Sequence, residues 1–373
     1  MKGKIFSCGS AGWGIILLVI LFILIFYSNC TKKSTRSYYK REYYLYASDT
    51  GGLKQKQIYI FSTESDSLVD SIYLGPNIYP GDLALSPDKR TLYVIAQIFD
   101  TISHTATLTY YEIDTRSKSI KYTGPNSNTD ISPDGKYIIR GGEEFLVFDS
   151  HTHKIIYQES TLFVPECFNK RAPLVYGGNN IIGGERGVIR VFNYITKQWV
   201  SSYKISLRDG SRPSFDDYVL SPDGNTLYLI ARSYDYRFYF CVFSLTQDSL
   251  LVQLEINSSG QLDIKPDGSI VYFTDPGGGG PCISIEPPPS GFLGVFDTKT
   301  NTPLPSISLE PLADSTHFHP LKPFIIKITP DGKKGYLSIC RDWILVIDLI
   351  RNEPLRVISF PEYRRLSLIW ITL

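Results

Sequence analysis

The chain contains the segment Leu220-Ser-Pro-Asp-Gly-Asn-Thr-Leu-Tyr-Leu229, in which a turn sequence separates two runs that favour strands. Proline presets the backbone of the second position of a type I turn, aspartate tolerates the third, and glycine supplies the left-handed residue that rejoins the next strand. The segment therefore predicts two antiparallel strands, A and B, joined by a tight turn. Four further copies are Leu85-Ser-Pro-Asp-Lys-Arg-Thr-Leu-Tyr-Val94, Ile131-Ser-Pro-Asp-Gly-Lys-Tyr-Ile-Ile139, Ile264-Lys-Pro-Asp-Gly-Ser-Ile-Val-Tyr-Phe273 and Ile328-Thr-Pro-Asp-Gly-Lys-Lys-Gly-Tyr-Leu337.

A second short motif follows each copy and predicts the end of a third strand, C. Its polar residue can bond local backbone in the turn to a fourth strand, D. The five examples are Tyr111-Glu-Ile-Asp-Thr115, Val147-Phe-Asp-Ser150, Val242-Phe-Ser-Leu245, Val295-Phe-Asp-Thr298 and Val346-Ile-Asp-Leu349. A repeat of about 40 to 50 residues made only of strands is typical of β-propeller blades.

Two further blades complete the count at seven. The gap between Pro133 and Pro222 leaves room for a hidden blade over residues 163–204, where Asn169-Lys-Arg-Ala172 replaces the usual turn. Residues 43–73 supply strands B, C and D without an A, and Leu366–Leu373 supply an A alone. We therefore expect an all-β, seven-bladed propeller of four-stranded antiparallel blades over residues 43–373. Its ring is expected to close by pairing of the N- and C-terminal strands, which removes free sheet edges.

These residues resemble the YVTN family of seven-bladed propellers. The family's Tyr-Val strand is matched by Leu92-Tyr-Val-Ile-Ala96 and Leu227-Tyr-Leu-Ile-Ala231, and the resemblance covers residues 43–373. It implies the fold more than a function, since members of this superfamily include surface-layer proteins, lactonase-like enzymes and binding proteins. A WD40 propeller is disfavoured, because Trp199, Trp343 and Trp370 are not followed by Asp.

The N-terminal segment predicts export and membrane attachment. Lys2 and Lys4 precede an apolar run over residues 14–27, a pattern typical of a signal segment. Cys30 follows the run, as the lipidated cysteine does in bacterial lipoproteins, so we expect residues 1–30 to act as a lipoprotein-like signal and 31–42 as a polar tether. An uncleaved anchor and ordinary cleaved secretion are the alternatives. As a plain spanning helix, the basic residues that follow would place the propeller in the cytoplasm: Lys32, Lys33, Arg36, Lys40 and Arg41.

The amino-acid composition limits the kinds of molecule that the protein is expected to bind. The chain has 373 residues and a formal net charge of +1, so no basic excess points to nucleic acid. It carries 26 Tyr and 20 Phe but a single Met, which favours strands over helices. A closed propeller of this kind is expected to be monomeric, in the cell envelope outside the cytoplasm.

The long loops predict where a ligand would bind. The A–B and C–D turns share one face and are short, whereas the B–C insertions (97–107, 232–237, 275–291) and the D–A insertions (205–216, 309–324) share the other face. Long loops on a rigid scaffold usually carry function. The polar ligand-binding candidates on this face are Arg208, Asp209, Arg212, Arg232, Asp235, Asp275, Asp314, His317, His319 and Arg341.

Signals for catalysis are weak. His317 and His319 lie two residues apart, but His104, His151 and His153 are scattered, and no His-x-x-Glu-His or Cys-x-x-Cys spacing indicates a metal. Pro276-Gly-Gly-Gly-Gly-Pro281 lacks the Lys-Ser/Thr of a phosphate loop. No cofactor is expected. Cys282 and Cys340 fall on one face of adjacent blades, and a disulfide between them is a hypothesis alongside two free thiols.

Three functions remain open at this stage. The leading one is a non-catalytic, membrane-attached module that recognises a protein, peptide or glycan through the B–C/D–A face. The second is a lactonase-like or other hydrolytic enzyme that uses His, Asp and Arg residues of the rim. The third is a subunit of a redox assembly in which the partner carries the cofactor, because no Cys-x-x-Cys-His haem motif occurs.

Overall fold

A computed structural model describes residues 43–49, 57–100, 103, 105–125, 129–178, 185–276, 291–309, 323–339, 343–359 and 369–372. All of them belong to one compact unit, Tyr43–Leu373. Across these ranges the regular structure consists of strands, and no helix there is long and apolar enough to cross a membrane. The predicted signal, Cys30 and the tether lie outside the described residues.

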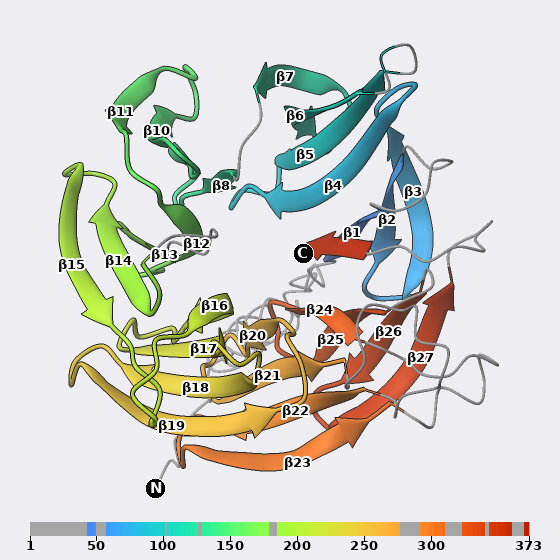
Figure 1. The fold of residues 1–373 in the computed structure, drawn as a ribbon. Helices are drawn as coiled ribbons and strands as arrows, with labels where there is room; N and C mark the ends of the chain where they lie inside the picture. The colour runs from blue at the N-terminus through green and yellow to red at the C-terminus, as the bar shows by residue number, and fades with distance from the viewer. Residues whose placement is uncertain are drawn as a thin grey trace, which may run out of the picture. The chain divides into compact units, whose positions relative to one another are not determined.

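The strands form seven four-stranded antiparallel sheets, and Figure 1 shows them set side by side around a centre. Blade 2 comprises β4 (Ile78–Leu85), β5 (Thr91–Asp100), β6 (Thr105–Asp114) and β7 (Ile120–Pro125). Blade 3 comprises β8 (Thr129–Ile131), β9 (Tyr137–Arg140), β10 (Phe145–Asp149) and β11 (Ile155–Glu159). Blade 4, the hidden one, comprises β12 (Val164–Phe168), β13 (Leu174–Gly178), β14 (Val188–Asn193) and β15 (Gln198–Lys204).

Blades 5 to 7 repeat the same meander in chain order. Blade 5 comprises β16 (Ser214–Leu220), β17 (Thr226–Arg232), β18 (Phe238–Ser244) and β19 (Ser249–Ile256). Blade 6 comprises β20 (Leu262–Ile264), β21 (Ile270–Asp275), β22 (Phe292–Asp297) and β23 (Thr302–Ser308). Blade 7 comprises β24 (Pro323–Ile328), β25 (Lys334–Ile339), β26 (Trp343–Asp348) and β27 (Glu353–Ser359).

Blade 1 is built from both ends of the described chain. Its strand order is β28-β1-β2-β3, with β28 (Ile369–Thr372), β1 (Tyr44–Asp49), β2 (Gln57–Ser62) and β3 (Ser67–Tyr73). Tyr46 pairs with Thr372 and Asp49 with Ile369 in the antiparallel register between β1 and β28. The C-terminal strand thus occupies the inner position that residues 43–73 leave empty.

The turns follow the chemistry expected from the repeat. In blade 5 the Ser221 hydroxyl donates to Asp223 at 2.5 Å, and the Thr226 N–H donates to the Ser221 hydroxyl at 2.9 Å. In blade 4, Asn169 takes the place of the serine and accepts the N–H groups of Arg171 and Ala172 through its side-chain oxygen. The hidden blade therefore joins its A and B strands through side-chain hydrogen bonds to the backbone, without the left-handed residue found in the other A–B turns.

Each C–D turn ends in a residue with left-handed backbone, and several of these residues bond a neighbouring blade. Their φ values lie between 49° and 59°, at Asp66, Lys118, His153, Lys197, Asp248, Asn301 and Asn352. The Asp66 carboxylate of blade 1 accepts the Tyr336 hydroxyl of blade 7 at 2.6 Å. Likewise the Tyr272 hydroxyl of blade 6 donates to Asn352 of blade 7 at 2.8 Å. These turns therefore hold adjacent blades together as well as connecting strands.

Apolar side chains fill the spaces between blades. One cluster joins blades 4 and 5 through Tyr176, Ile189 and Leu229, and another joins blades 6 and 7 through Tyr272, Leu293 and Leu337. Burial of these side chains supplies the main stabilisation of the sheets, at about 25 cal/mol for each Å² of apolar surface removed from water.

One expected loop is a strand hairpin instead. Residues 97–107 were predicted as a B–C insertion, but β5 continues to Asp100 and β6 begins at Thr105, with Gln97 opposite Leu108. Strand-favouring residues such as Ile98, Phe99 and Thr107 extend the ladder, so blade 2 has longer strands rather than a long loop.

Candidate functional site

A loop of blade 4 is anchored on the face predicted to bind ligand. Residues 205–213 connect β15 to β16, and the Ile205 N–H donates to the Gly187 carbonyl at 2.7 Å. The Gly187 N–H in turn donates to the Pro213 carbonyl at 2.7 Å. Gly187 has a φ of 70°, and a Cβ there would lie 2.5 Å from the Ile205 carbonyl oxygen. The loop is therefore held at both ends by a position that requires glycine.

Two tyrosines project into solvent from the neighbouring connection between β17 and β18. Tyr234 is 81% exposed and Tyr236 is 75% exposed. The turn that carries them is tight, since the Ser233 N–H donates to the Arg237 carbonyl at 2.9 Å and Tyr236 has a φ of 61°. The Arg186 guanidinium lies 5.2 Å from the centroid of the Tyr234 ring. Rigidly presented aromatic rings of this kind offer apolar contact at low entropic cost.

Charged pairs surround the two tyrosines. Arg237 pairs with Asp235 at 2.9 Å, Arg232 with Asp216 at 3.3 Å, and Arg212 with Glu185 at 3.8 Å. A hydrogen bond from the Ser233 hydroxyl holds the pKa of the Asp235 carboxyl below its ordinary value. We refer to residues 185–187, 205–216 and 232–237 as the blade 4/5 rim.

Five of the ten sequence candidates fall on the blade 4/5 rim: Arg208, Asp209, Arg212, Arg232 and Asp235. Asp275 does not, because it is fully buried and its carboxylate accepts the Asn257 N–H at 2.9 Å and the Ser258 hydroxyl at 3.1 Å. Its role in the described structure is to order the connection between β19 and β20.

The other four candidates, Asp314, His317, His319 and Arg341, lie outside the described residues, as do Cys282 and Cys340 of the hypothetical disulfide. The same holds for the Gly-rich segment. The hydrolytic alternative uses His, Asp and Arg residues of the rim, and both rim histidines lie outside the described residues, so it stays untested. Cys167 and Cys241 carry free thiols. Within the described ranges no three His, Cys, Asp or Glu side chains converge as metal ligands do.

Acidic side chains on the innermost strands were not singled out from the sequence. Burial raises the pKa of Asp82, Asp130 and Asp217 to about 6, with the Lys327 ammonium partly opposing the shift at Asp130 and Asp217. The Asp217 carboxylate accepts the Leu262 N–H at 2.6 Å, and Asp263 accepts the Ile328 N–H at 2.7 Å, so each links one blade to the next. The sequence does mark these aspartates, because each lies three or five residues before the proline of an A–B turn.

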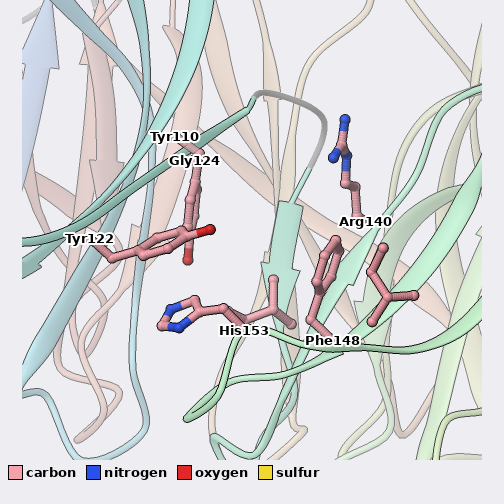
Figure 2. Close-up of a pocket in the computed structure, with 8 residues that line it drawn as sticks. Tyr110, Tyr122, Gly124, Arg140, Phe148 and His153 are labelled. Atoms are coloured by element: carbon pink, nitrogen blue, oxygen red, sulfur yellow. The ribbon is translucent and has the colours of Figure 1, made fainter.

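A pocket of about 180 Å³ lies between blades 2 and 3. Its lining, drawn in Figure 2, is Tyr110, Tyr122, Gly124, Ile138, Arg140, Phe148, His153 and Ile155. The His153 ring stacks on Tyr122 with the centroids 3.9 Å apart. Ile155 is 52% exposed, so the pocket reaches the surface beside an exposed apolar side chain.

Behind the pocket wall, the Glu112 carboxylate is buried and shared by two partners. It accepts the Tyr110 hydroxyl at 2.8 Å and lies 2.8 Å from Nε2 of His153. Burial and the adjacent Glu112 charge raise the pKa of Tyr110, so this phenol stays protonated as a donor. Sequence reasoning placed His153 in an ordinary turn and gave it no role.

The fold defines the chain as a seven-bladed β-propeller. No protein-family model matches the chain, and no curated protein matches it. Among solved structures it is similar to the chain titled Kuenenia stuttgartiensis hydrazine synthase, with a TM-score of 0.57 and 16% sequence identity over 75% of this chain and 86% of that one. At this identity the likeness shows the β-propeller fold alone.

Proposed function

We propose that this propeller is a non-catalytic binding module that recognises a protein, peptide or glycan through its blade 4/5 rim. The observation that carries the proposal is the pair of tyrosines, Tyr234 and Tyr236, held outward on a rigid turn among arginine and aspartate pairs. Tyrosine and arginine are enriched where proteins bind partners, and the paired acids offer acceptors for hydroxyl or amide groups.

The uniform turns of the opposite face provide the contrast that supports this choice. There the polar side chains bond their own turns, as Asp149 does with the Thr152 N–H at 2.7 Å and Asp297 does with the Thr300 N–H at 2.9 Å. Those polar groups serve to form the turns that connect the strands. Polar groups of the blade 4/5 rim also bond their own turns, but the rim adds two large exposed rings, Tyr234 and Tyr236, that its connections do not require.

The test is a binding screen of the full-length protein against glycan and peptide arrays, repeated with a Tyr234→Ser and Tyr236→Ser double variant. A matched control replaces two exposed apolar residues on turns of the other face, Ile195→Ser and Ile350→Ser, which are 53% and 70% exposed. We expect the rim variant to lose binding at least about tenfold while the control keeps it. Loss of binding only in the control would overturn the proposal.

We further propose that the module lies outside the cytoplasm and is attached to the membrane through lipid on Cys30. The apolar run over residues 14–27 and the cysteine that follows it support this placement. Cys30→Ala should abolish labelling by a fatty-acid analogue and leave the signal uncleaved. An intact mass showing that the mature protein begins elsewhere would contradict the proposal.

Two finer statements have separate support. We propose that the pairing of β1 with β28 closes the propeller ring. We also propose that the chain belongs with the YVTN propellers, whose strand signature it carries in blades 2 and 5. Closure would cover the inner edge of β1 with β28, so that each blade keeps a free edge only on its outer side.

A further inference from the structure

Strand β6 of blade 2 has an open edge that lies outside the blade 4/5 rim and is not used by the proposed function. Its first four residues, Thr105–Leu108, pair with β5 residue by residue. On its other side β6 pairs with β7 only from Thr109 onward. In the part of the chain that the structure describes, no strand therefore pairs with that side of Thr105–Leu108. We call these four residues the open edge of β6.

We propose that the open edge of β6 binds an extended peptide segment of another protein, which adds to blade 2 as a further strand. The observation that carries this inference is a run of four exposed residues that are paired on one side only. Pairing with β5 already orders the backbone of the edge, so the peptide segment alone loses conformational freedom on binding.

The backbone groups along this edge specify a strand as the occupant. In an antiparallel ladder, every second residue directs both its N–H and its C=O to the same neighbouring strand. Two of the four residues therefore direct both groups away from β5, and an added strand can form up to four hydrogen bonds with them. A helix cannot do so, because its own N–H and C=O groups are paired internally.

The open edge of β6 lacks the features by which outer strands of other blades avoid pairing. Natural sheet edges are blunted by prolines, charges and bulges. Strand β23 carries Pro303 and Pro305, and its ladder with β22 is interrupted by a register shift. Strand β27 carries Pro354 and Arg356, and its ladder with β26 is interrupted in the same way. Residues 105–108 contain no proline and no charge, and their ladder with β5 runs without a shift.

The side chains along the edge indicate the sequence of the peptide segment. All four are exposed, and Leu108 is 50% exposed. Because side chains alternate along a strand, Ala106 and Leu108 lie on one side of the hairpin and the two threonines lie on the other. Cross-strand pairs of β-branched or apolar residues and of threonines are favourable. We therefore expect a segment in which valine or isoleucine alternates with threonine.

The same alternation makes a second copy of this chain a poorer occupant. A twofold dimer pairs like edges antiparallel, so complete pairing would place Leu108 of one copy opposite Thr105 of the other. Likewise Ala106 would lie opposite Thr107. Residues that lie opposite one another share a face, so each apolar side chain would meet a threonine. A shift of one residue restores like pairs but leaves only three of them.

The experiment measures binding of the end-blocked, fluorescently labelled peptide Lys-Val-Thr-Val-Thr-Lys to the full-length protein by fluorescence anisotropy. In an antiparallel register its valines lie opposite Leu108 and Ala106, and its lysines keep it soluble. Two isomers carry N-methyl groups on both valines or on both threonines, so that one lacks the N–H groups directed at β6 and the other lacks those directed at solvent. We expect saturable binding of the parent peptide and of one isomer. The other isomer should bind at least about tenfold more weakly, because its hydrogen bonds to the edge are lost.

A variant and hydrogen exchange locate the site. Leu108→Ser should weaken binding of the parent peptide about threefold through the lost cross-strand contact. Leu251→Ser, on the outer strand β19 and 38% exposed, is the matched control and should leave binding unchanged. Bound peptide should also slow amide hydrogen exchange over residues 105–108. Absence of saturable binding, equal affinity of all three peptides, unchanged exchange over 105–108, or a dimer that protects this edge without peptide would overturn the inference.

Discussion

The two sides of blade 3 differ although both are built mainly of aromatic residues. Toward blade 4, Phe145 contacts Phe163 and Phe192 edge-on with centroids 4.8 and 4.7 Å apart, and all three rings are fully buried. Toward blade 2, Tyr122 stacks on His153 with the ring centroids 3.9 Å apart, whereas Tyr110 and Tyr122 of blade 2 meet edge-on at 6.3 Å, and the pocket lies beside them.

The two sides differ in the rings that meet there. Phenylalanine rings have no polar atom to satisfy, and Gly177 lets Phe163 come within 2.3 Å of where a Cβ would be. Tyr110 directs its hydroxyl at Glu112, which sets the orientation of the ring. The blade 4 side has a polar network too, since Tyr157 and Trp199 both donate to Glu159, so hydrogen bonding alone does not explain the open space beside Tyr110.

The largest effect is expected where blade 1 loses a whole strand. Removing Leu366–Leu373 deletes β28, which pairs with β1 and packs against the inner strands of blades 2 and 7. We expect a frayed sheet with an unpaired edge, a large drop in melting temperature and aggregation. Thermal unfolding and light scattering measure this, and wild-type stability in the truncated protein would contradict ring closure.

The next largest effect should be the difference in lost stability between variants on the two sides of blade 3. Phe145→Ala should reduce the free energy of unfolding by about 3–5 kcal/mol, because a fully buried ring leaves a cavity. Phe148→Ala, on the pocket side, should cost about 1–2 kcal/mol, since this half-buried ring already borders open space. Denaturant titration of both variants gives the comparison, and equal losses would refute the claim that one interface is filled and the other hollow.

The polar contacts of the two interfaces should rank in the opposite order, with the larger loss of stability on the pocket side. His153→Ala removes one of two partners of the buried Glu112 carboxylate and should cost about 2 kcal/mol. Trp199→Phe removes the donation from Nε1 to the more exposed Glu159, 2.8 Å long, and should cost about 1 kcal/mol. A larger loss from the tryptophan variant would show that its hydrogen bond, not ring packing, organises that interface.

The last predicted effect concerns pH at the inner edge of blade 3. Burial raises the pKa of Asp130 to about 6. The folded state therefore favours the protonated acid, and this contribution to stability is lost as pH rises through about 6. Asp130→Asn should stabilise the protein at pH 7 by about 1–2 kcal/mol, with the gain shrinking toward pH 4. Melting temperatures measured across this range test the sign, and a gain that grows at low pH would contradict it.

The repeat made most of the fold predictable, and its exceptions show why. The A–B turn of blade 4 was identified although Asn169 replaces the serine, because the flanking strands kept their pattern. The strands over 97–107 were read as a loop, since periodicity alone does not show how far a hairpin extends. Arg208, Asp209 and Arg212 lie on an irregular loop between β15 and β16, as their segment predicts, but the anchoring role of Gly187 could not be read from a single glycine.

Local chemistry along the chain was enough to determine the blades: proline and aspartate set each turn, alternation set each strand, and spacing set the number of sheets. Only the tertiary structure decided what lies between the blades. His153 and Glu112 belong to different repeats, and their contact depends on how two sheets pack. A turn residue's backbone preference is local and visible in the sequence, whereas its partner is set by the packing of a neighbouring sheet, which no local pattern encodes.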